Sequence, residues 1–244
     1  MHPILLSICL IAGIAGSVLA QNTFESDVLR TTAGSVKMTF IGHGSLLFEF
    51  GGKVIYMDPW SKLADYTKLP KADVILVTHE HFDHLDPAAI QAVRTTNTVV
   101  VISASCASKV RGGLVMKNGD VQTVTGVKVE AVPAYNLVNK REDGQPFHPQ
   151  GVGNGYILTL GDKRIYVAGD TENTPEMKAL SNIDVAFLPM NLPYTMTPDM
   201  VADAVRAFKP RILYPYHYGE TDPARLTALL KDVPGIEVRV RKLR

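Results

Sequence analysis

The stretch "VTHEHFDHLDP", residues 77–87, contains three of the seven histidines in this chain of 244 residues. His79, His81 and His84 fall within six positions, and Asp83 lies among them. Such crowding helps neither a hydrophobic core nor a solvated surface, because histidine is scarce and mostly neutral near pH 7. Imidazole and carboxylate groups are common ligands of protein-bound metal ions. The stretch therefore predicts a metal site.

The motif comes at the end of a predicted strand at 73–79. In an extended chain, the i, i+2 spacing of His79 and His81 places both imidazoles on one side. Asp83 and His84 follow in the turn before a predicted helix, so they can reach the same point from another direction. We therefore expect all four side chains to face one metal centre.

Two further candidate ligands also follow predicted strands. Asp170 ends the strand at 164–169 in "AGDT", and His217 follows the strand at 211–216 in "YPYHYG". Loops at strand ends are where a rigid sheet brings remote residues together. Both residues are therefore expected beside the histidine motif.

The remaining strands and the helices are predicted from apolar runs, turns and caps. "GG" at 51–52 and "GD" at 161–162 each predict a tight hairpin. Asp86-Pro87 and Thr197-Pro198 each pair an N-cap residue with a proline suited to the first helical position. Strands are expected at 36–42, 45–50, 53–58, 73–79, 98–103, 127–134, 155–160, 164–169, 184–189 and 211–216, and helices at about 87–95, from 198 to about 209, and 223–231. Hairpins mixed with crossover helices predict one α/β domain in which sheets and helices form layers.

Composition excludes some classes of function. The chain has 25 Lys and Arg against 24 Asp and Glu, a net charge of +1. A nucleic-acid-binding protein usually carries a basic surface, so no nucleic-acid partner is expected. Ordinary hydrophobic and charged contents, 46% and 20%, fit a soluble globular protein. The partner that we expect is a small-molecule substrate.

The first twenty residues, "MHPILLSICLIAGIAGSVLA", carry no charged side chain. They predict a signal peptide at 1–20, with cleavage after Val-Leu-Ala and a mature domain at 21–244. The positive charge that usually opens a signal peptide is missing, so an uncleaved N-terminal anchor is the alternative. Cleavage would leave Cys106 as the sole cysteine and no membrane span. We expect a periplasmic or secreted protein.

At these residues the chain resembles the metallo-β-lactamase superfamily. The stretch "HEHFDH" matches the H-x-H-x-D-H pattern of that superfamily in full. The stretches "FIGHGSLLFEFGGKVIYMDPW", "AGDT", "LPMNLPYTMTP" and "YPYHY" are similar to the branch of ascorbate-6-phosphate lactonases and N-acyl-phosphatidylethanolamine phospholipases D. The resemblance covers about residues 36–220. It implies an αββα sandwich with two metal ions at the sheet edge, but it leaves the substrate open.

The resemblance also implies a division of the ligands. His79, His81 and a third histidine would hold one ion; Asp83, His84 and His217 would hold the other, and Asp170 would bridge both. A ligand set without thiolate suits Zn²⁺, with Mn²⁺ or Fe²⁺ as alternatives. Asp83 and Asp170 would also position the attacking water.

The third histidine is where this sequence departs from the pattern. In much of the family it follows the "VPA" strand, where this chain has Asn136. His148, in "PFHPQGVGNGY", is the next candidate and the one we favour. The alternatives are a site completed by Asn136 or by water, with His148 a loop residue.

Three further residues are candidates for the surroundings of the metals. Asp58, in "MDPW", is expected to accept a hydrogen bond from a ligating histidine, since such histidines usually need that partner. His43, in "GHGS", either lines the pocket, supports a ligand or simply packs. Tyr194, in "NLPYTMTP", is either a rim aromatic or an acid near Asp170.

The expected function is metal-dependent hydrolysis of an ester, lactone or phosphodiester. One alternative is a true β-lactamase, which export would suit. The other is a non-catalytic metal-binding protein of the same fold, although a filled ligand set argues against it.

Overall fold

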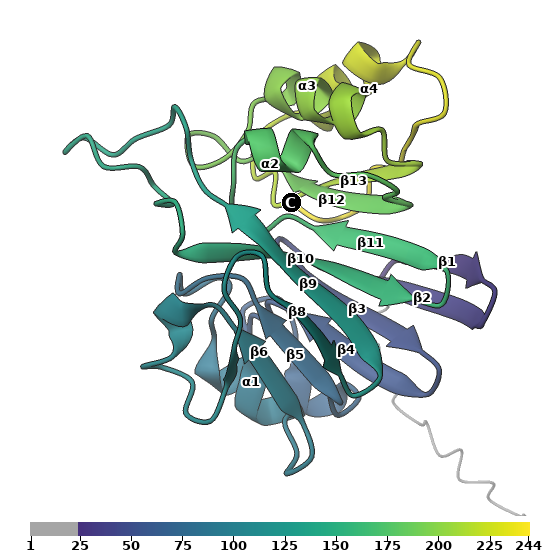
Figure 1. Ribbon diagram of the computed structural model, residues 1–244, viewed down its shortest axis with the longest axis vertical. Coiled ribbons are helices and arrows are strands. Elements are labelled where there is room, and N and C mark those ends of the chain that lie inside the picture. Colours follow the sequence, from purple (N-terminus) through teal and green to yellow (C-terminus); the bar gives the residue numbers. More distant parts are fainter. Residues whose placement is uncertain (1–23) are drawn as a thin grey trace, which may run out of the picture.

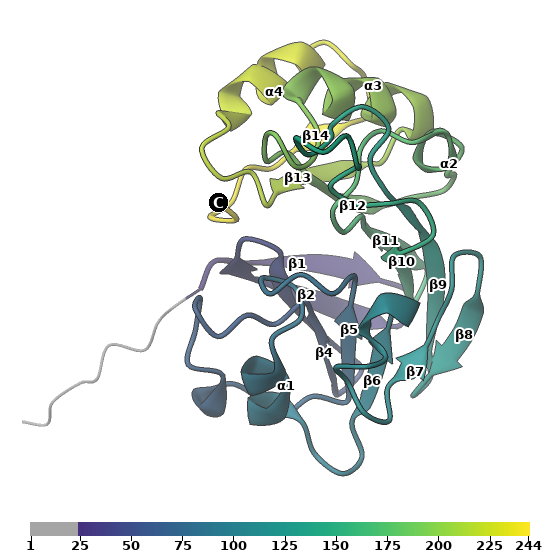
Figure 2. The ribbon, with the colours of Figure 1, turned by 90° about the vertical axis from the view of Figure 1, so that its left-hand side faces the viewer.

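Two seven-stranded sheets face each other in the computed structural model, which describes residues 24–244. Figure 2 shows the sheets as two inner layers, with α1 outside one and α3 and α4 outside the other. This is the expected αββα sandwich in one domain. The predicted signal peptide at 1–20 lies outside the described residues. None of the helices between residues 24 and 244 has the length and apolar character needed to cross a membrane.

The two sheets are built alike, as Figure 1 shows. Each has four antiparallel strands followed by three that run parallel to the fourth. The first contains β1 (Ser26–Thr31), β2 (Gly34–Gly42), β3 (Ser45–Phe50), β4 (Lys53–Met57), β5 (Val74–Val77), β6 (Val99–Ile102) and β7 (Leu114–Val115). The second contains β8 (Val121–Val124), β9 (Val127–Ala134), β10 (Gly153–Leu160), β11 (Lys163–Val167), β12 (Val185–Pro189), β13 (Ile212–Tyr216) and β14 (Glu237–Val238).

Turn and cap chemistry places the hairpin at 51–52 and the helices that begin at Pro87 and Pro198 as predicted. Gly51 and Gly52 have φ of 57° and 76°, which suits the two-residue turn that joins β3 to β4. Each helix starts with a proline after an Asp or Thr cap whose side chain accepts a backbone N–H. The helices are α1 (Pro87–Val93), α2 (Pro175–Lys178), α3 (Pro198–Phe208) and α4 (Pro223–Leu230), and short 3₁₀ turns lie at Tyr66–Lys68 and Ala104–Cys106.

The sequence prediction missed several elements. β1 was missed because its exposed and half-buried residues alternate without a fully buried position. α2 has only four residues, and β7, β8 and β14 are short strands at the sheet edges. The predicted strand at 73–79 ends earlier, at Val77, so His79 belongs to the loop.

Aromatic packing between the sheets holds the layers together. Phe187 and Tyr214 stack with ring centroids 4.8 Å apart, and Phe40 and Phe48 pack against them from the first sheet. All four side chains are buried. A second core lies between the first sheet and α1, around Tyr56 and Ile90. Burial of large aromatic groups on both sides makes each sheet a rigid support for its loops.

The parallel strands position the functional loops. β4 and β5 of the first sheet, and β11, β12 and β13 of the second, end at the same edge of the sandwich. Open sheets commonly bind ligands beyond the carboxyl ends of such strands. Most of the residues that the sequence singled out follow one of these ends.

Candidate metal centre

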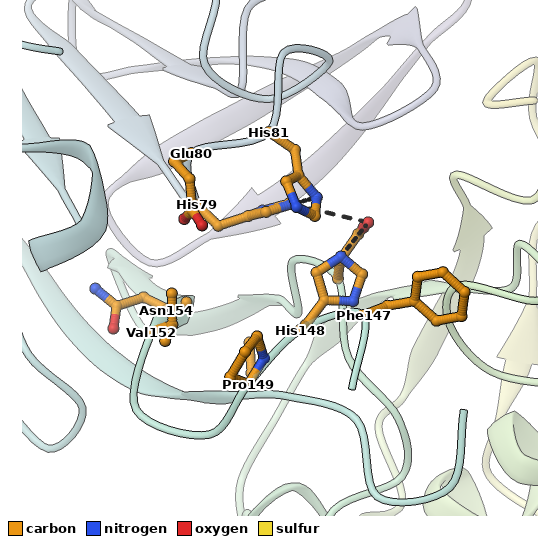
Figure 3. A pocket seen from close by; sticks show the side chains of 11 residues that line it. His79, Glu80, His81, Phe147, His148, Pro149, Val152 and Asn154 are labelled. Atoms are coloured by element: carbon orange, nitrogen blue, oxygen red, sulfur yellow. Dashed lines mark hydrogen bonds and ion pairs between the residues drawn. The ribbon is translucent and has the colours of Figure 1, made fainter. Parts of the chain in front are cut away.

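One cluster of ligand atoms comes from three separate loops. His79 and His81 follow β5, His148 precedes β10, and Asp170 follows β11. One ligand atom from each lies within 4.8 Å of every other. The Nε2 of His79 is 3.0 Å from Nδ1 of His81, and the Nε2 of His148 is 3.3 Å from Oδ2 of Asp170. Figure 3 shows the three imidazoles converging beside a pocket that is also bordered by Phe147 and Pro149.

A second cluster lies beside the first. His43, Asp83, His84 and His217 meet the same 4.8 Å criterion. The Nε2 of His43 lies 3.1 Å from Oδ2 of Asp83, and that oxygen is 3.5 Å from Nε2 of His217. The His43 and His217 rings lie 3.7 Å apart. The sequence left open whether His43 lines the pocket, supports a ligand or packs. In the structure, His43 contacts the Asp83 carboxylate directly.

Asp170 belongs to the first cluster and also faces the second. Its Oδ2 faces His148, while its Oδ1 lies 3.5 Å from Nε2 of His84 and 3.6 Å from Nε2 of His217. The carboxylate therefore presents one oxygen to each cluster. This is the arrangement that a bridging ligand requires.

Asp58 holds the His84 side of the centre. It follows β4 and is fully buried, and its Oδ2 lies 2.8 Å from Nδ1 of His84. The same carboxylate accepts hydrogen bonds from the backbone N–H and the hydroxyl of Thr78. A bond at Nδ1 directs the Nε2 of His84 into the centre.

A comparable chain of contacts holds His148. The side-chain oxygen of Asn136 accepts from the backbone N–H of His148 at 2.8 Å and lies 2.7 Å from its Nδ1. The amide nitrogen of Asn136 donates to Glu172, a fully buried carboxylate. His148 therefore belongs to the first cluster, and Asn136 contacts it from behind through the Nδ1 side of its ring.

Buried polar atoms in both clusters indicate that these residues bind a ligand. Among residues 24–244, Nε2 of His84, His148 and His217 and Oδ1 of Asp170 are buried without a hydrogen-bond partner. Unpaired buried polar atoms cost free energy, so several of them aimed at one point indicate a bound group. Imidazole and carboxylate donors fit divalent metal ions.

The pKa of His79 and His81, and the negative charge around His84, fit a centre that holds a cation. Burial lowers the pKa of His79 and His81, and neighbouring imidazoles lower it further, which favours the neutral form that binds metals. Burial also opposes protonation of His84, but the carboxylates of Asp170 and Asp58 outweigh it and raise its pKa to about 10. The centre therefore holds enough negative charge to attract a cation at this position.

The acidic groups remain ionised. Burial alone would raise the pKa of Asp83 and Asp170, yet the surrounding histidines lower both.

The backbone around the centre is strained, because His43, Asp58 and His217 have φ between 43° and 50°. Such conformations are uncommon for residues other than glycine and cluster at functional sites.

The family described as beta-lactamase superfamily domain matches residues 37–217, a span that includes both clusters. The chain belongs to the β-lactamase superfamily.

Relatives and solved structures agree with that membership. The chain is 30% identical over 220 residues to a UPF0173 metal-dependent hydrolase of Pelotomaculum thermopropionicum, with 84% of this chain and 96% of that protein covered. A crystal structure of a protein designated a metal-dependent hydrolase, from Parabacteroides distasonis, is 50% identical, covers 91% of this chain and 100% of its own, and gives a TM-score of 0.87. Igni18, a metallo hydrolase of Ignicoccus hospitalis, is 26% identical, with 85% and 95% covered and a TM-score of 0.71.

Fold, family and ligand cluster thus identify a metal-dependent hydrolase of the metallo-β-lactamase superfamily. The finer resemblance to the lactonase and phospholipase D branch remains a prediction. So do the roles of the individual site residues.

The remaining sequence candidates lie around the centre of this metallo-β-lactamase fold. Tyr194 is outside both clusters: its backbone carbonyl accepts from Asn136, and its ring packs against Phe147. Cys106 is buried beneath the first sheet. Sequence reasoning missed Thr78 and Glu172, although a glutamate two residues after Asp170 in "AGDTENT" is a signal that could have been followed.

Proposed function

We propose that this hydrolase binds two divalent metal ions and uses them to cleave an ester, lactone or phosphodiester bond. The observation that carries the proposal is the position of Asp170, which offers one carboxylate oxygen to each histidine cluster. A shared carboxylate offsets the repulsion between two cations held about 3.5–4 Å apart.

The ligands would divide between the two ions. His79, His81 and His148 would hold the first, and Asp83, His84 and His217 would hold the second, with Asp170 shared. Zinc is the ion proposed, because the donors are imidazole and carboxylate without thiolate. Two such ions would supply an acidified water and polarise the scissile carbonyl or phosphoryl group.

The chain's own groups set the geometry of that chemistry. Asp58 and Asn136 orient the imidazoles of His84 and His148 through their Nδ1 atoms. Asp83 stays ionised beside His43, so its carboxylate would be available to hold a metal ion and the attacking water. Burial of the ligand atoms keeps bulk water away and strengthens each electrostatic contact.

Elemental analysis of protein purified without chelator tests the metal content. We expect two ions per chain, and loss of metal and activity in His81→Ala and Asp170→Ala. One ion or none in the unmodified protein would contradict the dinuclear proposal.

A small substrate panel of lactones, phosphodiesters and a β-lactam tests the reaction. Hydrolysis should stop on chelation and survive Cys106→Ala and thiol-blocking reagents, because the mechanism uses no thiol. Hydrolysis that resists chelators but stops on thiol blocking would reject the mechanism, and cleavage of the β-lactam alone would favour a true β-lactamase.

We also propose export to the periplasm or the cell exterior, on the basis of the uncharged segment at 1–20. Intact-mass analysis of protein collected outside the cytoplasm should give a chain that starts at Gln21. A mass that retains residues 1–20 would favour an N-terminal anchor instead.

A further inference from the structure

Large apolar side chains are exposed on the loops that carry the candidate ligands. Nine are exposed within residues 24–244, and five of them belong to the loops that carry or border the ligands. These five are Phe82, Leu137, Val138, Leu192 and Tyr194, with exposed fractions between 44% and 70%. Isolated exposed apolar residues are normal, but a concentration at one functional site indicates a binding surface.

Two of these five residues, Phe82 and Tyr194, each pack against a second aromatic ring, and the two pairs Phe82–Trp60 and Phe147–Tyr194 are called here the apolar rim. Phe82 lies within the histidine motif, and its ring centroid is 5.9 Å from that of Trp60. Trp60 in turn lies 5.2 Å from His43, which contacts Asp83. The ammonium of Lys62 lies 5.4 Å from the Trp60 ring and 5.7 Å from the Phe82 ring, and such contacts favour a fixed arrangement of the pair.

Phe147 and Tyr194 form the other part, beside His148. Their rings meet edge to face with centroids 5.1 Å apart. Phe147 is the residue before His148 and borders the pocket in Figure 3. Asn136 joins Tyr194 to His148. Its amide nitrogen donates to the backbone carbonyl of Tyr194, and its amide oxygen accepts from Nδ1 of His148. Each aromatic pair is thus connected directly to one of the two ligand clusters.

We propose that the natural substrate carries an extended apolar group, an alkyl chain or an aromatic system, which lies against this rim while the bond to be cleaved lies at the metal centre. This inference rests on the proposed hydrolytic function. We assign the rim to a substrate group because each aromatic pair adjoins a residue of one ligand cluster, His43 in one case and His148 in the other. Ligand sites commonly combine apolar lining with a few converging polar groups, as here.

A series of 4-nitrophenyl alkanoates, from acetate to decanoate, tests the inference on zinc-loaded protein. We expect kcat/KM to rise about two- to fourfold for each added methylene until the rim is covered, as burial of CH₂ groups predicts. Phe82→Ser and Tyr194→Ser should each lower kcat/KM for the decanoate at least five times more than for the acetate. Val28→Ser is the matched control, because Val28 is 60% exposed on β1 and is not one of the rim residues. This substitution should leave kcat/KM unchanged for both esters. Equal kcat/KM along the series, or equal losses on both esters, would overturn the inference.

Calorimetric binding of alkyl hydroxamates of increasing length separates this inference from the proposed function. Tighter binding of longer chains, without cleavage of any ester, would refute ester hydrolysis and support the apolar rim. Chain-independent binding together with active hydrolysis would overturn the rim and leave the proposed function intact. Sedimentation velocity adds one more outcome: self-association that Val138→Ser abolishes would assign the apolar surface to a second copy and overturn the inference.

Discussion

At the scale of single residues, the pair formed by His148 and Asn136 makes the most specific prediction. Removal of the His148 imidazole should weaken metal binding at one site by more than about 100-fold, because a ligand is lost. Asn136→Ala should weaken it less, by about 10-fold, since only the bond that orients Nδ1 disappears. Competition with a chromogenic chelator, followed by metal analysis, measures both effects.

Asn139→Ala is a matched control for Asn136→Ala. Its side-chain amide donates to the carbonyl of Thr195 and has no bond to His148. We expect its metal affinity to equal that of the unmodified protein. A larger loss in Asn136→Ala than in His148→Ala would mean that the amide, not the imidazole, is the third ligand.

At the scale of elements, the segment 137–147, called here the arm, is anchored at its base by one carboxylate. Glu172 accepts the backbone N–H groups of Leu137, Val138 and Asn139 at 2.7–2.8 Å, besides the Asn136 amide. Figure 1 shows the chain between β9 and β10 projecting from the sandwich. The arm returns to the centre at His148, so its anchor also positions a ligand.

Glu172→Gln should loosen this anchor. The glutamine amide would place an N–H donor against the backbone N–H donors of the arm, and it would replace a charged acceptor. Hydrogen bonds to charged groups contribute about 1.5–3 kcal/mol to the free energy of unfolding. We expect a loss of free energy of unfolding in that range, and faster hydrogen exchange at 137–139 measured by mass spectrometry. Glu176→Gln, which alters only the acceptor of the Tyr135 hydroxyl, is the control. Unchanged exchange at 137–139 would show that the arm is held by other contacts.

At the scale of the whole molecule, Asp27 ties the start of the fold to its end. The carboxylate on β1 accepts from Arg241 at 2.8 Å and from the hydroxyl of Tyr214 on β13, and Arg239 lies nearby. Burial raises the pKa of Asp27, but these donors outweigh it and lower the pKa below its ordinary value. The ionised form is therefore favoured in the folded protein.

This direction sets a pH dependence of stability. Because the folded pKa lies below the unfolded value of about 3.9, the contribution of Asp27 is complete above that pH and is lost as pH falls through the folded pKa. Asp27→Asn should lower the free energy of unfolding by about 1–3 kcal/mol at pH 7, and the difference from the unmodified protein should shrink below pH 4. Urea unfolding at pH 7 and at a pH below 4 measures this difference in the free energy of unfolding. Asp199→Asn, in an exposed pair with Arg225, should have almost no effect at either pH.

Local chemistry in the sequence was sufficient for most elements and for the class of the site. Gly51-Gly52 determines a hairpin because both residues adopt positive φ, and Asp86-Pro87 starts a helix because cap and proline satisfy its first turn. "HEHFDH" identifies a metal motif because few other structures crowd imidazoles and a carboxylate. These signals act over a few residues, so they can be read without the fold. β1 carries no such signal, and only its pairing with β2 makes it a strand.

Only the tertiary structure decided which remote groups meet. The sequence offered both Asn136 and His148 as the third ligand, and they are twelve positions apart on one loop. The contacts of Asn136 depend on Glu172, which is buried after β11 and accepts from the amide nitrogen of Asn136, while the amide oxygen of Asn136 faces His148. The same holds for Asp170, which can face both clusters only because the two sheets bring their strand ends to one edge. Side chains from loops on different sheets meet through packing, and packing depends on the whole chain rather than on local pattern.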